Sequence, residues 1–169
     1  MTRHKAAYWI EHLQLKQHIE GGWYTEVYRS ELVLQKEQLP VSFSDPRNIC
    51  THIYFLLEKN GFSAFHRIKS DELWHFYAGD PLVVYEIDRS GEMIEHLLGN
   101  ETEKNQSLFC VIRKGNWFAS KVVHGGEYGL AGCTVSPGFD FNDFELAEKQ
   151  SLSNAFPRYA DLIADLTLK

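Results

Sequence analysis

The sequence has few cysteines and lacks long apolar runs. Its three cysteines, Cys50, Cys110 and Cys133, form no C-x-x-C pair and lie within apolar stretches, which is typical of small buried residues in a reducing compartment. The longest apolar run, 53–57, is far shorter than the roughly 20 residues of a membrane-spanning helix. The first 15 residues lack the apolar segment of a signal peptide. We therefore expect a cytoplasmic protein with no membrane segment.

Basic residues are too few and too scattered to suggest a nucleic-acid partner. Seventeen lysines and arginines stand against 23 acidic residues, which gives a formal charge of -6. A negative protein without a basic cluster is repelled by a phosphate backbone. Low-complexity sequence is also absent, and the 44% hydrophobic content is that of an ordinary globule. At 169 residues, we expect one folded domain that spans residues 1–169.

Strand-length runs separated by turn residues fill the middle of the chain. Turn chemistry such as Asn60-Gly61 and Gly79-Asp80-Pro81 separates them at intervals typical of an antiparallel sandwich or barrel. We expect nine or ten strands in a mainly β fold, with the sheet region ending at Pro137-Gly138. The runs lie at 23–29, 49–57, 63–68, 73–78, 82–88, 93–98, 108–112, 117–123 and 128–135.

Helices are expected only near the two ends. Thr2 is a suitable N-cap for a helix over about 3–15, and Gly21-Gly22 follows it. A second helix is expected over 158–168 after Pro157, because its apolar residues recur at helical spacing.

The segment that follows Gly61 carries the strongest chemical signal. Alternation places Ala64, His66 and Ile68 on one face of a strand. If that face lines a cavity, His66 and Glu72 form an acid–base pair whose pKa values burial shifts towards neutrality. The alternative is a hydrogen-bonded core histidine with a partly exposed glutamate.

Three segments together resemble a known family. The spacing of His66, Ile68, Glu72 and Gly79 is similar to the first motif of the cupin superfamily, written His-x-His-x3-Glu-x6-Gly, and 113–118 stands where the second motif is expected. The resemblance covers about residues 6–165. Its closest form is an uncharacterised cupin family whose members are similar in shape to dTDP-4-dehydrorhamnose 3,5-epimerases. The segments that carry this resemblance are 20–24, 70–79 and 135–139.

The resemblance implies a jelly-roll barrel, the cupin double-stranded β-helix, with short terminal helices. Metal-binding cupins use two histidines and the glutamate of the first motif and one histidine of the second. Here Ile68 replaces one ligand and the last position falls near Phe118, and neither side chain offers a lone pair to a metal. We therefore expect no metal and no other cofactor. The alternative is that His75 or His124 rebuilds a site.

Further candidates surround this motif. If Glu72 faces the lumen, Trp74 follows it, whereas His75 and Tyr77 occupy the opposite face unless a bulge intervenes; we still retain both as catalytic candidates. Arg29 suits an anionic ligand, and the alternative is a salt bridge to Glu26 or Glu31. His4, His12, His18, His52 and His96 have no partner at an informative spacing, so we expect structural or exposed roles. The aromatic candidates for ligand contact, which also suit a core or an interface, are Trp23, Trp74, Trp117 and Phe139.

The leading hypothesis is a small-molecule-binding protein that acts as a metal-independent sugar or nucleotide-sugar epimerase or isomerase. His66 would remove a proton next to a carbonyl, and Glu72 or a tyrosine such as Tyr77 would supply or orient a proton. The alternatives are a non-catalytic small-molecule-binding cupin and a metal-dependent oxygenase. We also expect a homodimer, in which the strand 23–29 pairs with a second copy and covers its own exposed edge.

Overall fold

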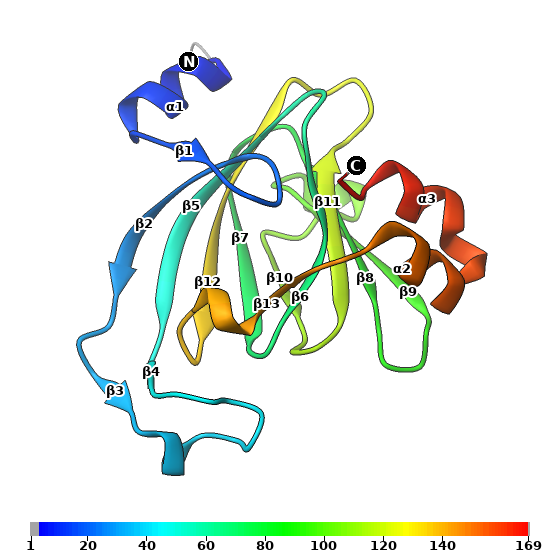
Figure 1. Ribbon diagram of the computed structural model, residues 1–169. Coiled ribbons are helices and arrows are strands. Elements are labelled where there is room, and N and C mark those ends of the chain that lie inside the picture. Colours follow the sequence, from blue (N-terminus) through cyan, green and yellow to red (C-terminus); the bar gives the residue numbers. More distant parts are fainter. Residues whose placement is uncertain (1–3, 169) are drawn as a thin grey trace.

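Two antiparallel sheets face each other in the computed structural model, which describes residues 4–168 (Figure 1). The large sheet contains, in spatial order, β1 (Lys16–Gln17), β2 (Trp23–Arg29), β5 (Thr51–Glu58), β12 (Tyr128–Ser136), β7 (Asp71–Gly79) and β10 (Phe109–Ile112). The small sheet contains β13 (Phe144–Leu146), β6 (Phe62–Ile68), β11 (Trp117–Val122), β8 (Leu82–Ile87) and β9 (Met93–Leu98). The non-sequential strand orders are those of a jelly roll, as expected from the sequence.

The main core lies between the two sheets and follows from the alternation of side chains along each strand. On β5, Phe55 and Leu57 point inwards, while Leu56 points outwards into a different cluster. On β7, Trp74 and Phe76 point inwards in the same way. The sheets remain separate in their hydrogen bonding, so the lumen is the space between two facing layers.

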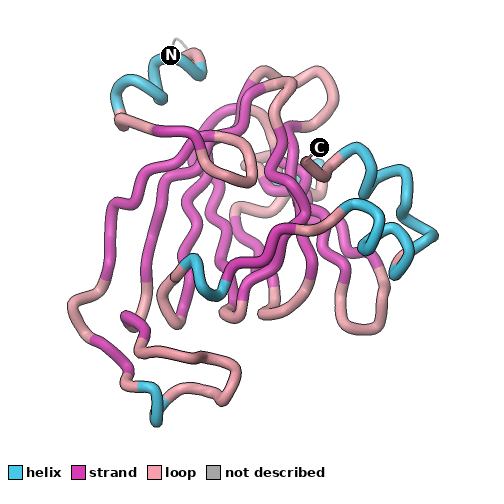
Figure 2. The backbone as a smooth tube through the Cα atoms, in the orientation of Figure 1, coloured by secondary structure: helices cyan, strands magenta, loops and turns pink. Residues whose placement is uncertain are grey.

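Short helices pack at one end of the large sheet and on the outer side of the small sheet (Figure 2). Helix α1 (Ala6–His12) packs on the outer face of the large sheet beside Leu56 and Leu130. Helices α2 (Lys149–Ala155) and α3 (Ala160–Asp165) cover the outer face of the small sheet. None of the helices within residues 4–168 has the length and apolarity needed to cross a bilayer.

A two-stranded extension and four 3-10 turns complete the chain. Strands β3 (Val33–Leu34) and β4 (Arg47–Asn48) pair with each other and project beyond the sheets (Figure 1). The turns are η1 (Lys36–Gln38), η2 (Thr102–Lys104), η3 (Phe141–Asp143) and η4 (Pro157–Tyr159).

The predicted elements need several corrections. The first helix is shorter than 3–15, because Gln14 adopts a positive φ of 52° after it; the proposed Thr2 cap lies outside the described residues. The expected helix over 158–168 is divided into η4 and α3. The expected nine or ten strands are thirteen within residues 4–168, and the sheet region continues past Pro137-Gly138, since β13 pairs with the edge of β6.

Candidate functional site

A cavity of about 500 Å³ opens between the sheets and has acidic, imidazole and aromatic walls. This volume lies within the range of about 300–1,000 Å³ that is typical of small-molecule sites. Strands β2, β5, β6, β7 and β12 form its inner walls, and the segment through η3 covers its mouth. The lining residues are Lys16, His18, Glu20, Tyr24, Glu26, Arg29, Ile53, Phe55, His66, Glu72, Trp74, Cys133, Val135, Phe139, Asp140, Phe141 and Asn142.

Glu20 is the polar centre of this cavity. Its side chain is 8% exposed, and one carboxylate oxygen accepts a 2.8 Å hydrogen bond from Ser63 Oγ. The other oxygen, Oε2, lies 3.2 Å from His18 Nδ1 and 3.3 Å from His66 Nε2. One buried carboxylate therefore joins two imidazole rings.

The turn after Glu20 fixes its position. Gly21 and Gly22 have φ values of +105° and +72°, a region that favours glycine. A Cβ atom on Gly21 would lie 2.2 Å from the carbonyl oxygen of Phe62, so only glycine allows this approach to β6. The Glu20 carbonyl also accepts a 2.8 Å hydrogen bond from Ala64 N. Backbone contacts on β6 therefore hold Glu20 next to His66.

His66 presents a lone pair to this carboxylate when it is neutral. Its Nδ1 lies 2.7 Å from the carbonyl oxygen of Ala64, and a carbonyl can only accept, so Nδ1 carries the proton. Burial lowers the pKa of His66, and the attraction of Glu20 offsets this only in part. Burial raises the pKa of Glu20, but the charge of His66 and hydrogen bonds from His18 and Ser63 outweigh it and leave the pKa below its usual value. Nε2 and Oε2 lie 3.3 Å apart, close enough to share one proton.

Glu72 is a second carboxyl group with the opposite character. It is buried on β7, and burial together with the charge of Glu20 raises its pKa to about 8, while Cys133 and Trp74 act in the other direction. Glu72 is therefore a neutral carboxylic acid at neutral pH. Two carboxyl groups in one cavity thus hold different protonation states, a pattern that is typical of acid–base sites.

Arg29 reaches the mouth of the cavity, but its donors are already engaged. Its Nε and Nη2 form a bidentate pair with Glu26 at 2.9 and 2.7 Å. Nη1 donates to Asn48 Oδ1 at 2.9 Å, and both Nη atoms reach the carbonyl oxygen of Phe139. The geometry therefore favours the predicted salt bridge to Glu26, and Arg29 holds the chain at Phe139.

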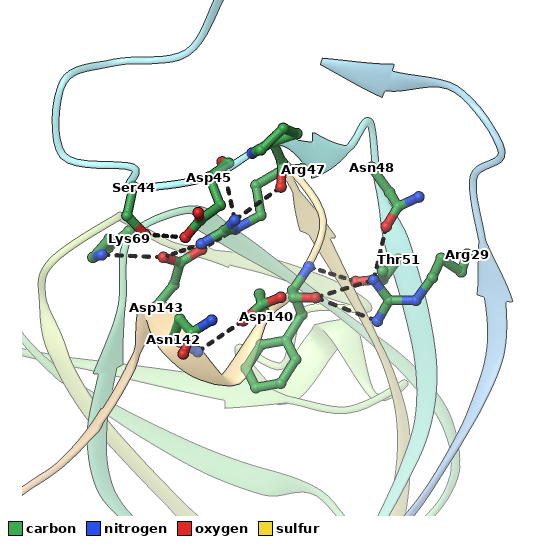
Figure 3. A network of polar contacts seen from close by, with 12 residues as sticks. Arg29, Ser44, Asp45, Arg47, Asn48, Thr51, Lys69, Asp140, Asn142 and Asp143 are labelled. Atoms are coloured by element: carbon green, nitrogen blue, oxygen red, sulfur yellow. Dashed lines mark hydrogen bonds and ion pairs between the residues drawn. The ribbon is translucent and has the colours of Figure 1, made fainter. Parts of the chain in front are cut away.

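A second arginine anchors the same covering segment (Figure 3). Arg47 on β4 forms a bidentate ion pair with Asp143 on η3, at 2.6 and 2.8 Å, and both side chains are almost fully buried. Lys69 adds a contact to Asp143 at 3.1 Å. Asp140 accepts a 2.8 Å hydrogen bond from the backbone N–H of Asn142 and closes the turn. The cover of the cavity is therefore held from β2, from β4 and from the bend that follows β6.

Several predicted site residues lie away from the cavity. His75 and Tyr77 point to the outer face of the large sheet, where Tyr77 OH lies 3.1 Å from His52 Nε2. The bulge on β7 leaves Tyr77 without a partner between Phe76, opposite Ala131, and Ala78, opposite Leu130, yet the Tyr77 side chain still points outwards to His52. His66, Glu72, Arg29, Trp74 and Phe139, in contrast, all line the cavity.

The two other aromatic candidates also lie outside. Trp23 is on the outer face of the large sheet, where its Nε1 donates to Glu58 at 2.9 Å. Trp117 packs on the outer face of the small sheet beneath Arg67, whose guanidinium carbon lies 4.4 Å from the ring centre. Their positions indicate packing roles.

The sequence reasoning missed part of the site. His18 had no partner at an informative spacing and was expected to be structural or exposed, yet it contacts Glu20 in the cavity. His52 and His96 make contacts compatible with the expected structural role, to Thr134 and to Glu86, both at 2.7 Å. Tyr24, Cys133 and Phe141 were also not anticipated as cavity residues. The available signal for Glu20 was a polar pair, His18-x-Glu20, placed just before a double glycine.

The side chains at the metal-ligand positions of the motif do not suit a transition metal. His66 Nδ1 is used by the backbone, and its Nε2 faces Glu20. Ile68 is buried at the missing ligand position, and the Phe118 ring lies 4.0 Å from the His66 ring. His75 points outwards, and His124 is exposed in a turn. Within residues 4–168, no group of three or more potential ligands is arranged to hold an ion.

We expect the purified protein to contain no stoichiometric iron, manganese, nickel or zinc, because isoleucine and phenylalanine provide no ligand atoms. Elemental analysis of the protein purified without chelators is the measurement. About one metal ion per chain that is lost in a His66→Asn variant would contradict this expectation.

Comparison with known proteins gives a consistent picture. Residues 7–147 match the model of a family described as Cupin superfamily (DUF985). A hypothetical protein from Leishmania major is 33% identical with a TM-score of 0.89, covering 98% of this chain and 100% of its own. A protein from Shewanella oneidensis is 35% identical with a TM-score of 0.88, covering 98% of both chains. Oxalate decarboxylase from Bacillus subtilis, at 14% identity and a TM-score of 0.53 over 89% of this chain and 36% of that one, is similar in fold alone. No curated protein matches the chain.

Proposed function

The chain belongs to the Cupin superfamily (DUF985) family, and on that premise we propose that it binds a small carbonyl sugar, free or nucleotide-linked, and epimerises or isomerises it without a metal. The observation that carries the proposal is the contact between His66 Nε2 and Glu20 Oε2 at 3.3 Å. A proton held between these two atoms forms a charge-assisted hydrogen bond. The pair is therefore a suitable base.

The reaction follows from this arrangement. The base takes a proton from the carbon next to the substrate carbonyl, and the electron pair of the broken C–H bond moves to the carbonyl oxygen as an enolate. The proton then lies between His66 and Glu20. A second group returns a proton to the same carbon from the other face, and the enolate reverts to the carbonyl.

The proton donor in this proposal differs from the tyrosine named from the sequence. Tyr77 is on the outer face of the large sheet, whereas Tyr24 lines the cavity next to His18, with the two ring centres 4.5 Å apart. Tyr24 and the neutral Glu72 are the two candidate donors on the cavity wall.

The test is proton exchange in deuterated water. We expect NMR to show deuterium entering the carbon next to the carbonyl of a 4-keto sugar when the protein is present, in either the free or the nucleotide-linked form. Absence of exchange with every 4-keto sugar tested would reject the epimerase and leave a non-catalytic binding protein, the second function that this cavity suits.

We also propose that the protein forms a homodimer through β2. β2 pairs with β5 along one edge. On its other edge, β1 pairs only with Trp23 and Tyr24, so residues Glu26 to Arg29 have no strand partner on that edge among the described residues. Val27 and Tyr28 on this edge are 46% and 53% exposed. A bulge between Glu26 and Tyr28 interrupts the regular backbone hydrogen bonding of this strand. We therefore expect the exposed apolar side chains to contribute to the dimer contact along with the backbone.

Light scattering at micromolar concentration should therefore give the mass of a dimer. We expect a Val27→Glu variant to shift towards the monomer, because it places a charge at the centre of the contact. An Ile94→Glu variant, at an exposed residue on the far edge strand β9, is the control and should stay dimeric. A monomeric parent protein would reject this assembly.

The proposed location is the cytoplasm. Cys50, Cys110 and Cys133 are all free thiols in the structure, which is compatible with a reducing compartment.

A further inference from the structure

The indole N–H of Trp74 is a buried donor without a hydrogen-bond partner. Trp74 is 1% exposed and lines the cavity. Its Nε1 is close enough to Glu72 to influence that carboxyl group, yet it has no partner in hydrogen-bonding geometry among the described residues. An indole N–H can only donate, and a buried donor left unsatisfied is destabilising. An acceptor on a ligand in the cavity would satisfy this donor.

Glu72 stands beside this donor. It lies two residues before Trp74 on β7, so both side chains point to the same face. Ionisable groups near Glu72 come from three other elements: Glu20 from the turn before β2, Cys133 from β12 and Cys110 from β10. Burial raises the pKa values of both thiols, and the imidazoles of His18 and His66 contact Glu20, so no cation contacts Glu72 among the described residues. Its carboxyl group keeps a proton at neutral pH and can donate it in a hydrogen bond.

We propose that Trp74 Nε1 and the protonated Glu72 carboxyl together bind the carbonyl oxygen of an uncharged substrate. This inference rests on the proposed function, and it adds which group of the substrate binds beside Trp74 and Glu72. Two neighbouring donors fit the two lone pairs of one carbonyl oxygen.

The same two donors suit the enolate that proton removal would create. Negative charge develops on the carbonyl oxygen, and fixed donors in a buried site stabilise that charge more than water does. A carboxylic acid kept neutral by burial is a known way to provide such a donor. A substrate with a carboxylate at this end is disfavoured, because Glu20 already places a negative charge in the cavity.

The experiment uses two small aromatic probes of similar size, acetophenone and benzoate. Each has a flat ring suited to the aromatic walls of the cavity, but only acetophenone presents an uncharged carbonyl. We expect acetophenone labelled with ¹³C at the carbonyl to bind at millimolar concentration at pH 7, with its carbonyl resonance moved downfield. Benzoate should bind at least about tenfold more weakly beside Trp74, because Glu20 opposes its charge at this end of the cavity.

The variant Trp74→Phe removes the N–H and keeps a ring. We expect it to weaken acetophenone binding by about 3- to 10-fold, the value of one hydrogen bond, and to reduce the downfield shift. The parent indole resonance of Trp74, identified by its loss in this variant, should move when acetophenone is added. The control is Trp23→Phe, whose indole donates to Glu58 outside the cavity, and this variant should bind acetophenone as the parent does.

The variant Glu72→Gln tests the second donor. Its amide donates at every pH, so acetophenone binding should be constant between pH 7 and 9. In the parent, binding should fall by up to about tenfold over this range as Glu72 ionises around its pKa of about 8. Benzoate binding as tight as acetophenone, an indole resonance that does not move, or no binding of acetophenone at all would each overturn the inference. None of these readouts needs deuterium exchange, so the inference and the proposed epimerase fail separately.

Discussion

Replacing His66 with asparagine is expected to lower deuterium incorporation into a 4-keto sugar by about 10²- to 10⁴-fold, the usual contribution of a general base. Asparagine retains a hydrogen-bonding group but cannot accept the proton. Circular dichroism should show an intact fold, and light scattering an unchanged mass. NMR in deuterated water measures the exchange. His66→Gln, whose side chain is longer, keeps the test valid if the asparagine variant is poorly folded.

Glu20→Gln examines the other half of the base. Its amide has nearly the same shape, yet its NH₂ group can donate to His66 Nε2 and occupy the lone pair that the proton needs. We expect a loss of exchange similar to that of His66→Asn. The matched control is His75→Asn on the outer face of the large sheet, which should exchange at the parent rate.

A purely structural His66 gives a different pattern. Its ring packs against Phe118 and Phe144, so asparagine would then leave an imperfectly filled and poorly satisfied site. The loss would be about 1–3 kcal/mol, which lowers the melting temperature by several degrees. A clearly destabilised variant, together with a parent that exchanges no sugar, would reject the epimerase.

The strand positions are readable from the sequence because they depend on local patterns. Alternation puts His66 and Phe65 on opposite faces of β6, and in the structure His66 lines the cavity while Phe65 packs on the outer side; alternation also puts Trp74 on the same side as Glu72. Turn residues such as Asn60-Gly61 predict a strand end that the structure also shows, since β5 ends just before this pair and β6 begins just after it. Such local rules work because each strand has one buried and one less buried face.

Elements that depend on distant partners are not readable in this way. Strand β13 has only three residues, and it exists because it pairs with the free edge of β6. Helix α2 buries only Leu152, so its amphipathic pattern is weak. Both elements depend on tertiary contacts that cannot be predicted from the local sequence.

The same limit applies to the candidate site. The motif identified His66 and Glu72, but the partner of His66 comes from a turn before β2, far away in the sequence. Spacing arguments compare neighbours along one strand, whereas Glu20 reaches His66 through the close contact of Gly21 with Phe62. Only the three-dimensional arrangement shows that Glu20 and Glu72 share one cavity.

Replacing Arg47 with methionine is expected to cost the largest amount of stability among the ion-pair variants. Arg47 and Asp143 have side chains only 3% and 4% exposed, and removal of one partner from a buried pair typically costs about 3–5 kcal/mol. For a chain of this length, that corresponds to a fall in melting temperature of about 6–20 °C. The control is Arg113→Met, whose pair with Asp71 is 70% and 34% exposed and should contribute no more than about 1 kcal/mol.

The double variant Arg47→Met/Asp143→Leu separates the cost of an unpaired charge from the value of the pair. It leaves no uncompensated buried carboxylate, so it should be more stable than Arg47→Met alone. Lys69, 3.1 Å from Asp143, shields part of the charge in the single variant, which favours the lower end of the expected loss. Because Asp143 ends the η3 turn that covers the cavity, Arg47→Met should also weaken acetophenone binding, whereas Arg113→Met should not. Thermal unfolding and the same NMR titration measure both effects, and a melting temperature unchanged by Arg47→Met would show that the covering segment is held in place without this pair.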